Sequence, residues 1–325
     1  MRLPCNKRTC PKIKNMDEYF EILENAYKAE YALKKSKAYR LSIKLLNFYH
    51  SIKYGFFIEN LKREIRWRKI SKYSSKSIVS DFKYGSYPDE SLKILVYTCV
   101  TNGYDNPLPP VFSIPNVDYV LYTDNQDVRV DGWQILQIPQ EIKKLENGTL
   151  INRYFKMHPP KNGKDYDYSI YIDGNIQVRS NIRNIINAIS PKTGLAIHRH
   201  GSRNCIYDEV EACRILKKGN ISNLKKQIEK YQKEGMPAKF GLYECTIIVC
   251  NLHHINAQEL LHKWWCEFVE SESLRDQISL PYIIWKNGYS IDDIGNLGYN
   301  LVNNPKFKYV LHSNKDKRFV SLTTN

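Results

Sequence analysis

The chain has 325 residues, of which 42% are hydrophobic and 26% are charged. This balance is typical of a globular protein with one or two domains and excludes disorder as the main state of the chain. No run of about 18 apolar residues occurs, and the first residues lack the apolar segment of a signal peptide. We therefore expect a cytoplasmic protein without a transmembrane helix.

Positive charge is concentrated at the start of the chain. Residues 1–88 contain 20 Lys and Arg against 8 Asp and Glu, a net +12, so the remaining residues contribute only +3 to the total of +15. Such asymmetry indicates a negatively charged partner, either anionic lipid headgroups or nucleic acid, although a solvated helical face explains it equally well. No nucleic-acid-binding motif occurs, so nucleic acid is not the expected partner.

The eight cysteines are scattered along the chain. Most lie within apolar or regular segments, which predicts reduced, buried thiols. Cys5 and Cys10 have no second pair of Cys or His nearby, so the support for a zinc site is weak.

Residues 17–72 show helical periodicity, because apolar side chains recur at steps of three and four residues from Tyr19 onwards. Asn15 is a candidate cap for the first helix. A further helix is predicted over about 57–68, where four Lys and Arg, followed by Lys69, lie beside an apolar stripe. Residues 57–72 thus have the form of a helix that lies on an anionic membrane surface, and packing of the stripe on the next domain is an equal alternative.

The composition changes after 71–91, a stretch rich in Ser, Lys and Tyr that predicts a linker. We therefore divide the chain into a basic helical N-terminal region with its linker, 1–88, and a second domain, 89–325. In this domain apolar runs alternate with helical patterns, which predicts an α/β sandwich with a largely parallel sheet. The predicted strands are 92–98, 117–123, 133–138, 168–173, 194–198 and 246–250, and the predicted helices are 181–189, 208–217, 223–234 and 257–270.

The most informative strand is 168–173, which breaks at its end into Asp173, Gly174 and Asn175. Open α/β sheets bind ligands at the C-terminal ends of their strands. A carboxylate there can hold a divalent cation, which in turn holds the pyrophosphate of a nucleotide-sugar. The motif makes glycosyl transfer the leading hypothesis, although Asp-Gly after a strand is also a common turn.

Polar residues at the ends of the first two strands are candidates for nucleotide binding. Thr101, Asn102, Gly103, Tyr104 and Asp105 follow the first strand, and Thr123 and Asp124 end the second. Backbone groups and a carboxylate at these positions would frame a base and the hydroxyls of a ribose. As isolated features they are ordinary turn residues.

Basic side chains near these strand ends are candidates for the diphosphate and the sugar. Arg153 and Lys156 stand three residues apart on one helical face upstream of Asp173, where paired cations would neutralise a leaving diphosphate. A surface salt bridge is an equal alternative for this pair. His200 and Arg203 follow another strand and are candidates for contacts to sugar or phosphate.

A transferase also needs a carboxylate or an amide near the anomeric carbon, as a base toward the acceptor hydroxyl or as support for positive charge on the sugar. Glu244 precedes a buried-looking strand, and Asp276 and Gln277 begin an apolar helix, so these three are the candidates. Asp208 and Glu209 are explained instead by the preference of carboxylates for a helix N-terminus.

Several of these segments, in the same order, resemble the mucilage-related glycosyltransferase-like family. The resemblance spans about residues 93–300 and leaves the N-terminal region outside. It is carried by 168–174, 197–200, 207–212, 227–235, Glu244 with the apolar run after it, and 275–277.

The resemblance implies a GT-A-like, Rossmann-like sandwich of the nucleotide-diphospho-sugar transferase type, with Asp173 at the metal or diphosphate position. The pair Asp276-Gln277 is similar to the one that lines the donor sugar in some retaining transferases of this fold. Mn²⁺ or Mg²⁺ is then the expected cofactor, with Asp173, Asn175 and His312 as its ligands. Asn175 departs from the second Asp that is typical of GT-A enzymes and offers a neutral oxygen, while plant relatives have a Lys there that would replace the cation.

We expect a glycosyltransferase held near the inner face of an anionic membrane by residues 57–72. It would move a sugar from a nucleotide-diphosphate donor to a polysaccharide, glycan or lipid-linked glycan in cell-surface or capsular glycan synthesis. One alternative is a non-catalytic nucleotide- or carbohydrate-binding protein of the same fold. Another is nucleic-acid binding through the basic N-terminal region.

Overall fold

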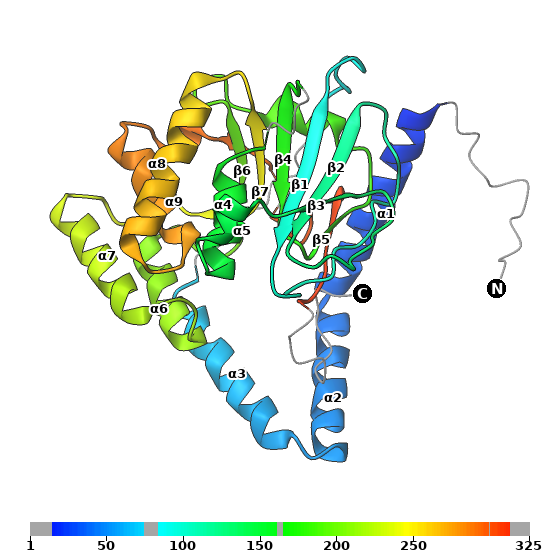
Figure 1. The fold of residues 1–325 in the computed structure, drawn as a ribbon. Coiled ribbons are helices and arrows are strands. Elements are labelled where there is room, and N and C mark those ends of the chain that lie inside the picture. The colour runs from blue at the N-terminus through cyan, green and yellow to red at the C-terminus, as the bar shows by residue number, and fades with distance from the viewer. Residues whose placement is uncertain (1–14, 75–83, 161–164, 299, 313–325) are drawn as a thin grey trace, which may run out of the picture.

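The computed structural model describes residues 15–74, 84–160, 165–298 and 300–312. Its centre is a seven-stranded sheet in the order β3-β2-β1-β4-β7-β6-β8, with helices packed beside it (Figure 1). The strands are β1 (Ile94–Val100), β2 (Val117–Thr123), β3 (Gln134–Gln137), β4 (Tyr168–Ile172), β6 (Leu195–Arg199), β7 (Tyr243–Asn251) and β8 (Gly295–Asn296).

The sheet is mostly parallel, as predicted, with one strand reversed. β1 runs parallel to β2 and β4, β2 to β3, and β6 to β8, whereas β7 lies antiparallel between β4 and β6. Ile172 at the end of β4 pairs with Ile247 in the middle of β7, so the first residues of β7 extend beyond β4. The reversal therefore brings the first residues of β7 to the edge where β4 ends.

Alternate residues of the central strands pack on opposite sides of the sheet. Leu95 and Tyr97 of β1 face a helical layer, whereas Ile94 and Val96 face a thinner layer. The helical layer comprises α4 (Gln140–Lys143), α5 (Gly148–Met157), α6 (Ile206–Leu216), α7 (Ile221–Lys233), α8 (Ile255–Ser271) and α9 (Asp276–Lys286). The thinner layer includes the 3₁₀ helix η1 (Arg183–Ala188) and the two-stranded sheet of β5 (Ile176–Val178) and β9 (Phe307–Tyr309). A short 3₁₀ helix, η2 (Ile291–Asp293), leads into β8.

The helix predicted at 181–189 is the 3₁₀ helix η1. Ile182 and Ile185 are three residues apart, a spacing that aligns side chains on one face of a 3₁₀ helix, and both are fully buried. The cysteine prediction is confirmed for Cys99, Cys205, Cys213, Cys245 and Cys250, which are buried free thiols, but it is wrong for the exposed Cys266. Cys5 and Cys10 lie outside the described residues.

The N-terminal region forms three helices, α1 (Met16–Lys35), α2 (Lys37–Lys53) and α3 (Phe57–Ser71). Asn15 caps α1, as predicted, and Ser36 separates α1 from α2 by accepting a hydrogen bond from the backbone of Tyr39. Residues 75–83 of the predicted linker lie outside the described part of the chain. Within the described ranges, no helix is both long and apolar enough to cross a bilayer.

Helix α1 packs on the sheet domain. The rings of Phe20 and Phe112 lie 5.1 Å apart, and Glu24 forms an ion pair of 2.7 Å with the buried Lys306. Helices α2 and α3 form a V that extends away from the sheet, and α3 returns to contact α6 (Figure 1). The helical extension is therefore attached to the domain at both of its ends.

Candidate active site

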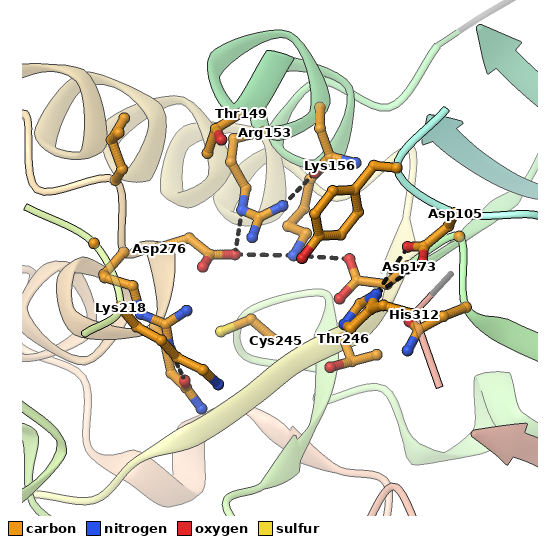
Figure 2. Close-up of a pocket in the computed structure, with 18 of the residues that line it drawn as sticks. Asp105, Thr149, Arg153, Lys156, Asp173, Lys218, Cys245, Thr246, Asp276 and His312 are labelled. Carbon is orange, nitrogen blue, oxygen red and sulfur yellow. Dashed lines mark hydrogen bonds and ion pairs between the residues drawn. The ribbon is translucent and has the colours of Figure 1, made fainter. Parts of the chain in front are cut away.

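A cavity of about 820 Å³ opens at the edge of the sheet where β1 and β4 end and β7 begins. Its lining combines the loop after β1, one face of α5, the turn after β4 and the start of α9 (Figure 2). The sequence predicted a ligand-binding site at this edge of the sheet. The predicted site residues that line the cavity are Thr101, Asn102, Tyr104, Asp105, Arg153, Lys156, Asp173, Asn175, His200, Arg203, Glu244, Asp276, Gln277 and His312.

Three predicted nucleotide contacts, Gly103, Thr123 and Asp124, are not part of the cavity lining. The carboxylate of Asp124 accepts the backbone N–H of Asn102 at 2.9 and 3.1 Å. Asn102 and Gly103 have positive φ angles of 55° and 59°, so the loop turns sharply at this point. Asp124 and Gly103 therefore shape the loop, and a direct contact of either residue with the nucleotide stays a prediction.

Glycines allow the cavity walls to approach each other closely. A Cβ on Gly174 would lie 2.6 Å from Cγ2 of Val100 and 3.2 Å from Cβ of Asp105. A Cβ on Gly148, at the start of α5, would lie 2.6 Å from the Thr101 hydroxyl. Gly148 was not predicted, although Asn147 before it caps α5 and is a recognisable helix-start signal.

Lys156 lies at the centre of a buried ionic network. Its Nζ is 2.9 Å from Oδ2 of Asp276 and 3.2 Å from Oδ1 of Asp173, and Lys156 is only 1% exposed. Nε of Arg153 is 2.9 Å from the same oxygen of Asp276 (Figure 2). The two cations therefore form a buried network with carboxylates from two other segments rather than a surface salt bridge.

The network fixes the charge of Asp276. Burial acts to raise its pKa, but Arg153 and Lys156 outweigh burial and hold the pKa of Asp276 well below its usual range. Asp276 is also the first residue of α9, where a helix N-terminus favours a carboxylate. It is therefore ionised at neutral pH and can stabilise positive charge but cannot act as a general acid.

A second network is centred on Glu209, which is 4% exposed. It accepts hydrogen bonds from Arg203 at 2.5 Å and from Arg275 at 3.3 Å. Arg275 also donates to the side-chain oxygen of Gln277, whose amide nitrogen donates to the Tyr243 carbonyl. Both the oxygen and the nitrogen of the Gln277 amide are thus held by hydrogen bonds. Glu209 and Arg275 are functional candidates that the sequence reasoning missed.

His200 and Glu244 form a neutral histidine–carboxylate arrangement beside this network. Nδ1 of His200 accepts the backbone N–H of Arg203 at 2.9 Å. Nε2 lies 3.2 Å from the guanidinium of Arg203 and 3.8 Å from Glu244. Burial lowers the pKa of His200 to about 4. Burial, together with the charge of Glu209, raises the pKa of Glu244, which suits a general base.

The three predicted metal ligands lie in the cavity but do not converge. His312 lies 2.8 Å from Asp105, and the amide nitrogen of Asn175 donates to the carbonyl of Val310. Oδ1 of Asp173 faces both Lys156 and the hydroxyl of Tyr171. Among the residues that the structure describes, no group of three His, Cys, Asp or Glu is arranged to hold a metal.

The charge balance of the cavity nevertheless fits a cation that binds together with a diphosphate. The lining contains six carboxylates and five Lys or Arg, so a diphosphate would add negative charge to a lining with no excess of cations. Mg²⁺ bound largely by phosphate oxygens needs only one or two carboxylates from the protein. The oxygens of Asp173 and Asn175 fit that requirement.

Tyr104 belongs to the loop that we expected to bind the nucleotide. Its side chain lines the cavity, is 50% exposed, and has its ring centre 5.1 Å from that of His312. An exposed aromatic face beside the polar loop is suited to stacking on a base or a sugar. Its place between Gly103 and Asp105, in a loop already expected to bind nucleotide, is the signal that identifies it.

A family model covers most of the sheet domain, and two solved structures show a weaker similarity. The family described as "TOD1/MUCI70, glycosyltransferase-like domain" matches residues 123–312, more than half of the chain. The apo form of mouse xyloside xylosyltransferase 1 is similar at 12% identity and a TM-score of 0.35, covering 60% of this chain and 82% of that one. Galactosyltransferase LgtC in complex with donor and acceptor sugar analogs is similar at 12% identity and a TM-score of 0.33, covering 58% and 70%. No curated protein sequence matches the chain.

Proposed function

Because this chain belongs to the TOD1/MUCI70 glycosyltransferase-like family, we propose that it transfers a sugar from a nucleotide-diphosphate donor to a glycan or lipid-linked glycan acceptor. Its fold is GT-A-like, as predicted. One observation carries the proposal: the cavity joins a polar loop after β1, Asp173 at the end of β4, and the buried pair Lys156–Asp276. A nucleotide, a diphosphate and a reacting sugar would contact these three features in that order along one edge of the sheet.

The loop after β1 is the proposed nucleoside subsite. Thr101, Asn102 and Asp105 supply polar groups, and Tyr104 supplies an aromatic face. Asp173 and Asn175 are the proposed ligands of Mn²⁺ or Mg²⁺, and His312 stands beside Asp105 at the same end of the cavity. The cation would supply the positive charge that the lining lacks for binding a diphosphate.

Charge separates when the sugar leaves the diphosphate, and the network around Lys156 contains groups suited to both sides of that separation. Lys156 and Arg153 present cations toward the leaving diphosphate, and the ionised Asp276 supports positive charge on the sugar. The acceptor oxygen forms the new bond to the anomeric carbon, and the nucleoside diphosphate leaves with the bonding electron pair. Glu244 takes the proton of the acceptor hydroxyl.

A thermal-shift screen tests donor binding. The protein is mixed with UDP-, GDP-, CMP- and dTDP-sugars, each with and without Mn²⁺. One nucleotide class is expected to stabilise the fold by about 2.7 kcal/mol at a hundred times its dissociation constant. The shift should vanish in Asp173→Ala and persist in Asp127→Ala, which removes an exposed carboxylate outside the cavity lining. No shift with any nucleotide-sugar would contradict the proposal.

A non-catalytic binding protein of the same fold is the second candidate function. The departure of Asn175 from the usual second Asp favours it. This candidate predicts the same nucleotide-dependent shift without release of nucleoside diphosphate from the donor. Slow donor hydrolysis in the absence of acceptor, lost in Asp276→Asn, would rule it out.

A further inference from the structure

Residues 37–72 form a helical hairpin of α2, a short turn and α3, which we call the N-terminal hairpin. It extends from the domain as a V, with α1 at one end and α6 at the other (Figure 1). The turn is closed by Gly55, with a φ of 74°, and by the buried ring of Phe56. The hairpin is therefore an ordered element, yet most of its surface lies away from the sheet domain.

The hairpin buries several polar side chains and exposes many large apolar ones. Its buried positions include Asn47, Ser51 and Asn60, and Asn60 donates a hydrogen bond to Ser51 between the two helices. Large apolar side chains on both helices are instead more than half exposed: Leu41, Leu45, Ile52, Ile58, Leu61 and Trp67. Scattered exposed apolar residues are common, but a set of this size on one small element marks an interaction surface.

Basic side chains accompany this apolar surface. The hairpin contains ten Lys and Arg against two Glu. Lys62, Arg66 and Lys69 lie along one side of α3 and line a hollow of about 570 Å³ that Arg214 of α6 completes. The apolar residues Leu61 and Ile65 directly precede Lys62 and Arg66, so the two kinds of side chain lie on adjoining faces of α3.

We propose that the N-terminal hairpin binds the surface of a membrane that contains anionic lipids. Its aliphatic and aromatic side chains would enter the boundary between headgroups and acyl chains, and its Lys and Arg would contact the headgroup phosphates. A second copy of the chain fits less well, because two strongly basic hairpins repel each other. Nucleic acid also fits less well, because the phosphate backbone gives exposed Leu and Ile side chains no apolar surface to contact.

Vesicle flotation of the full chain tests this proposal independently of the transferase proposal. The chain should float with vesicles of phosphatidylcholine mixed with phosphatidylglycerol and should bind phosphatidylcholine alone far more weakly. The apolar variant Leu45→Ser, Ile58→Ser, Trp67→Ser should partition at least about tenfold more weakly. A matched variant, Leu33→Ser, Val111→Ser, Ile255→Ser, changes exposed apolar residues outside the hairpin and should bind like the wild type.

A charge variant separates the electrostatic contribution from the apolar one. Changing Lys62, Arg66 and Lys69 to Gln should weaken binding to anionic vesicles roughly a hundredfold, because each basic residue near an anionic surface contributes about a factor of five. Equal binding of the wild type to neutral and anionic vesicles would overturn the proposal, as would unchanged flotation of both variants. A dimer that the apolar variant dissociates, without flotation of the wild type, would assign the surface to a second copy instead. Binding to duplex DNA or RNA, without flotation, would assign it to nucleic acid.

Discussion

The cavity and the N-terminal hairpin both reverse the usual distribution of side chains, but in opposite directions. In the cavity, Lys156 and Asp276 are charged yet only 1% and 3% exposed. In the hairpin, Leu45 and Ile58 are apolar yet 59% and 63% exposed. Globular proteins ordinarily bury apolar residues and expose charged ones, and each reversal costs free energy. We therefore propose that the two reversals mark two ligand-binding surfaces, one for a charged small molecule and one for a lipid surface.

Removing one charge from the cavity should have the largest effect on stability. Lys156→Met leaves Asp276 buried with one fewer cation and should lower the free energy of unfolding by about 3–5 kcal/mol, because a broken buried ion pair leaves an uncompensated charge. Urea denaturation measures this loss. Lys286→Met removes a half-exposed partner of Glu234 and should cost at most about 1 kcal/mol. Equal losses in the two variants would mean that burial of the network has no energetic consequence.

Mild acid should destabilise the sheet domain through its buried histidines. Burial lowers the pKa of His198 to about 3 and that of His200 to about 4. The unfolded chain therefore binds protons below about pH 6.5 that the folded chain does not bind, so stability falls as the pH is lowered. We expect a loss whose slope rises toward about 1.4 kcal/mol per histidine per pH unit as the pH falls from 6.5 to 5. Denaturation at several pH values should show this slope, reduced in His200→Asn, and a flat profile would contradict it.

Two glycine substitutions test how closely neighbouring atoms pack in the cavity and in the N-terminal hairpin. Gly174→Ala places a Cβ 2.6 Å from Val100 beside Asp173 and should cost about 1–3 kcal/mol and weaken donor binding. Gly55→Ala, in the hairpin turn, meets no neighbouring atom but has a φ of 74°, so it should cost about 1–2 kcal/mol through backbone strain alone. Thermal shift with and without donor separates the two, because only Gly174→Ala should alter the donor-dependent shift.

Substitutions on the exposed face of the hairpin should have the smallest effect on stability. Leu45→Ser and Ile58→Ser remove apolar side chains that water already contacts, so each should change the free energy of unfolding by less than about 0.5 kcal/mol. Urea denaturation checks this expectation. A loss above 1 kcal/mol would show that these side chains pack within the chain and would remove the contrast with the cavity.

Much of the sheet domain follows from local patterns in the sequence. Apolar runs identified the long strands, and Asp173 and Glu244 were placed at their ends. The reversal of β7 could not be predicted, because a fully buried strand has the same apolar run in either direction. Pairing decides its direction, and this pairing is what brings Glu244 into the cavity.

The site residues that were missed depend on contacts between distant segments. Glu209 has a sufficient local explanation at the start of α6, so its pairing with Arg275, 66 residues later, gives no signal in one sequence. Gly148 likewise matters only because the loop at Thr101 lies against it. By contrast, the Arg153–Lys156 spacing on one helical face correctly placed both cations together.

We propose that the cavity is the active site of a transferase. The most direct test measures nucleoside diphosphate release from the stabilising donor by the wild type, Asp276→Asn and the control Asp127→Asn, each shown by circular dichroism to be folded. We predict release by the wild type and the control, and a kcat lowered about a hundredfold or more in Asp276→Asn. Equal turnover in all three proteins, or donor binding without any release, would contradict the claim.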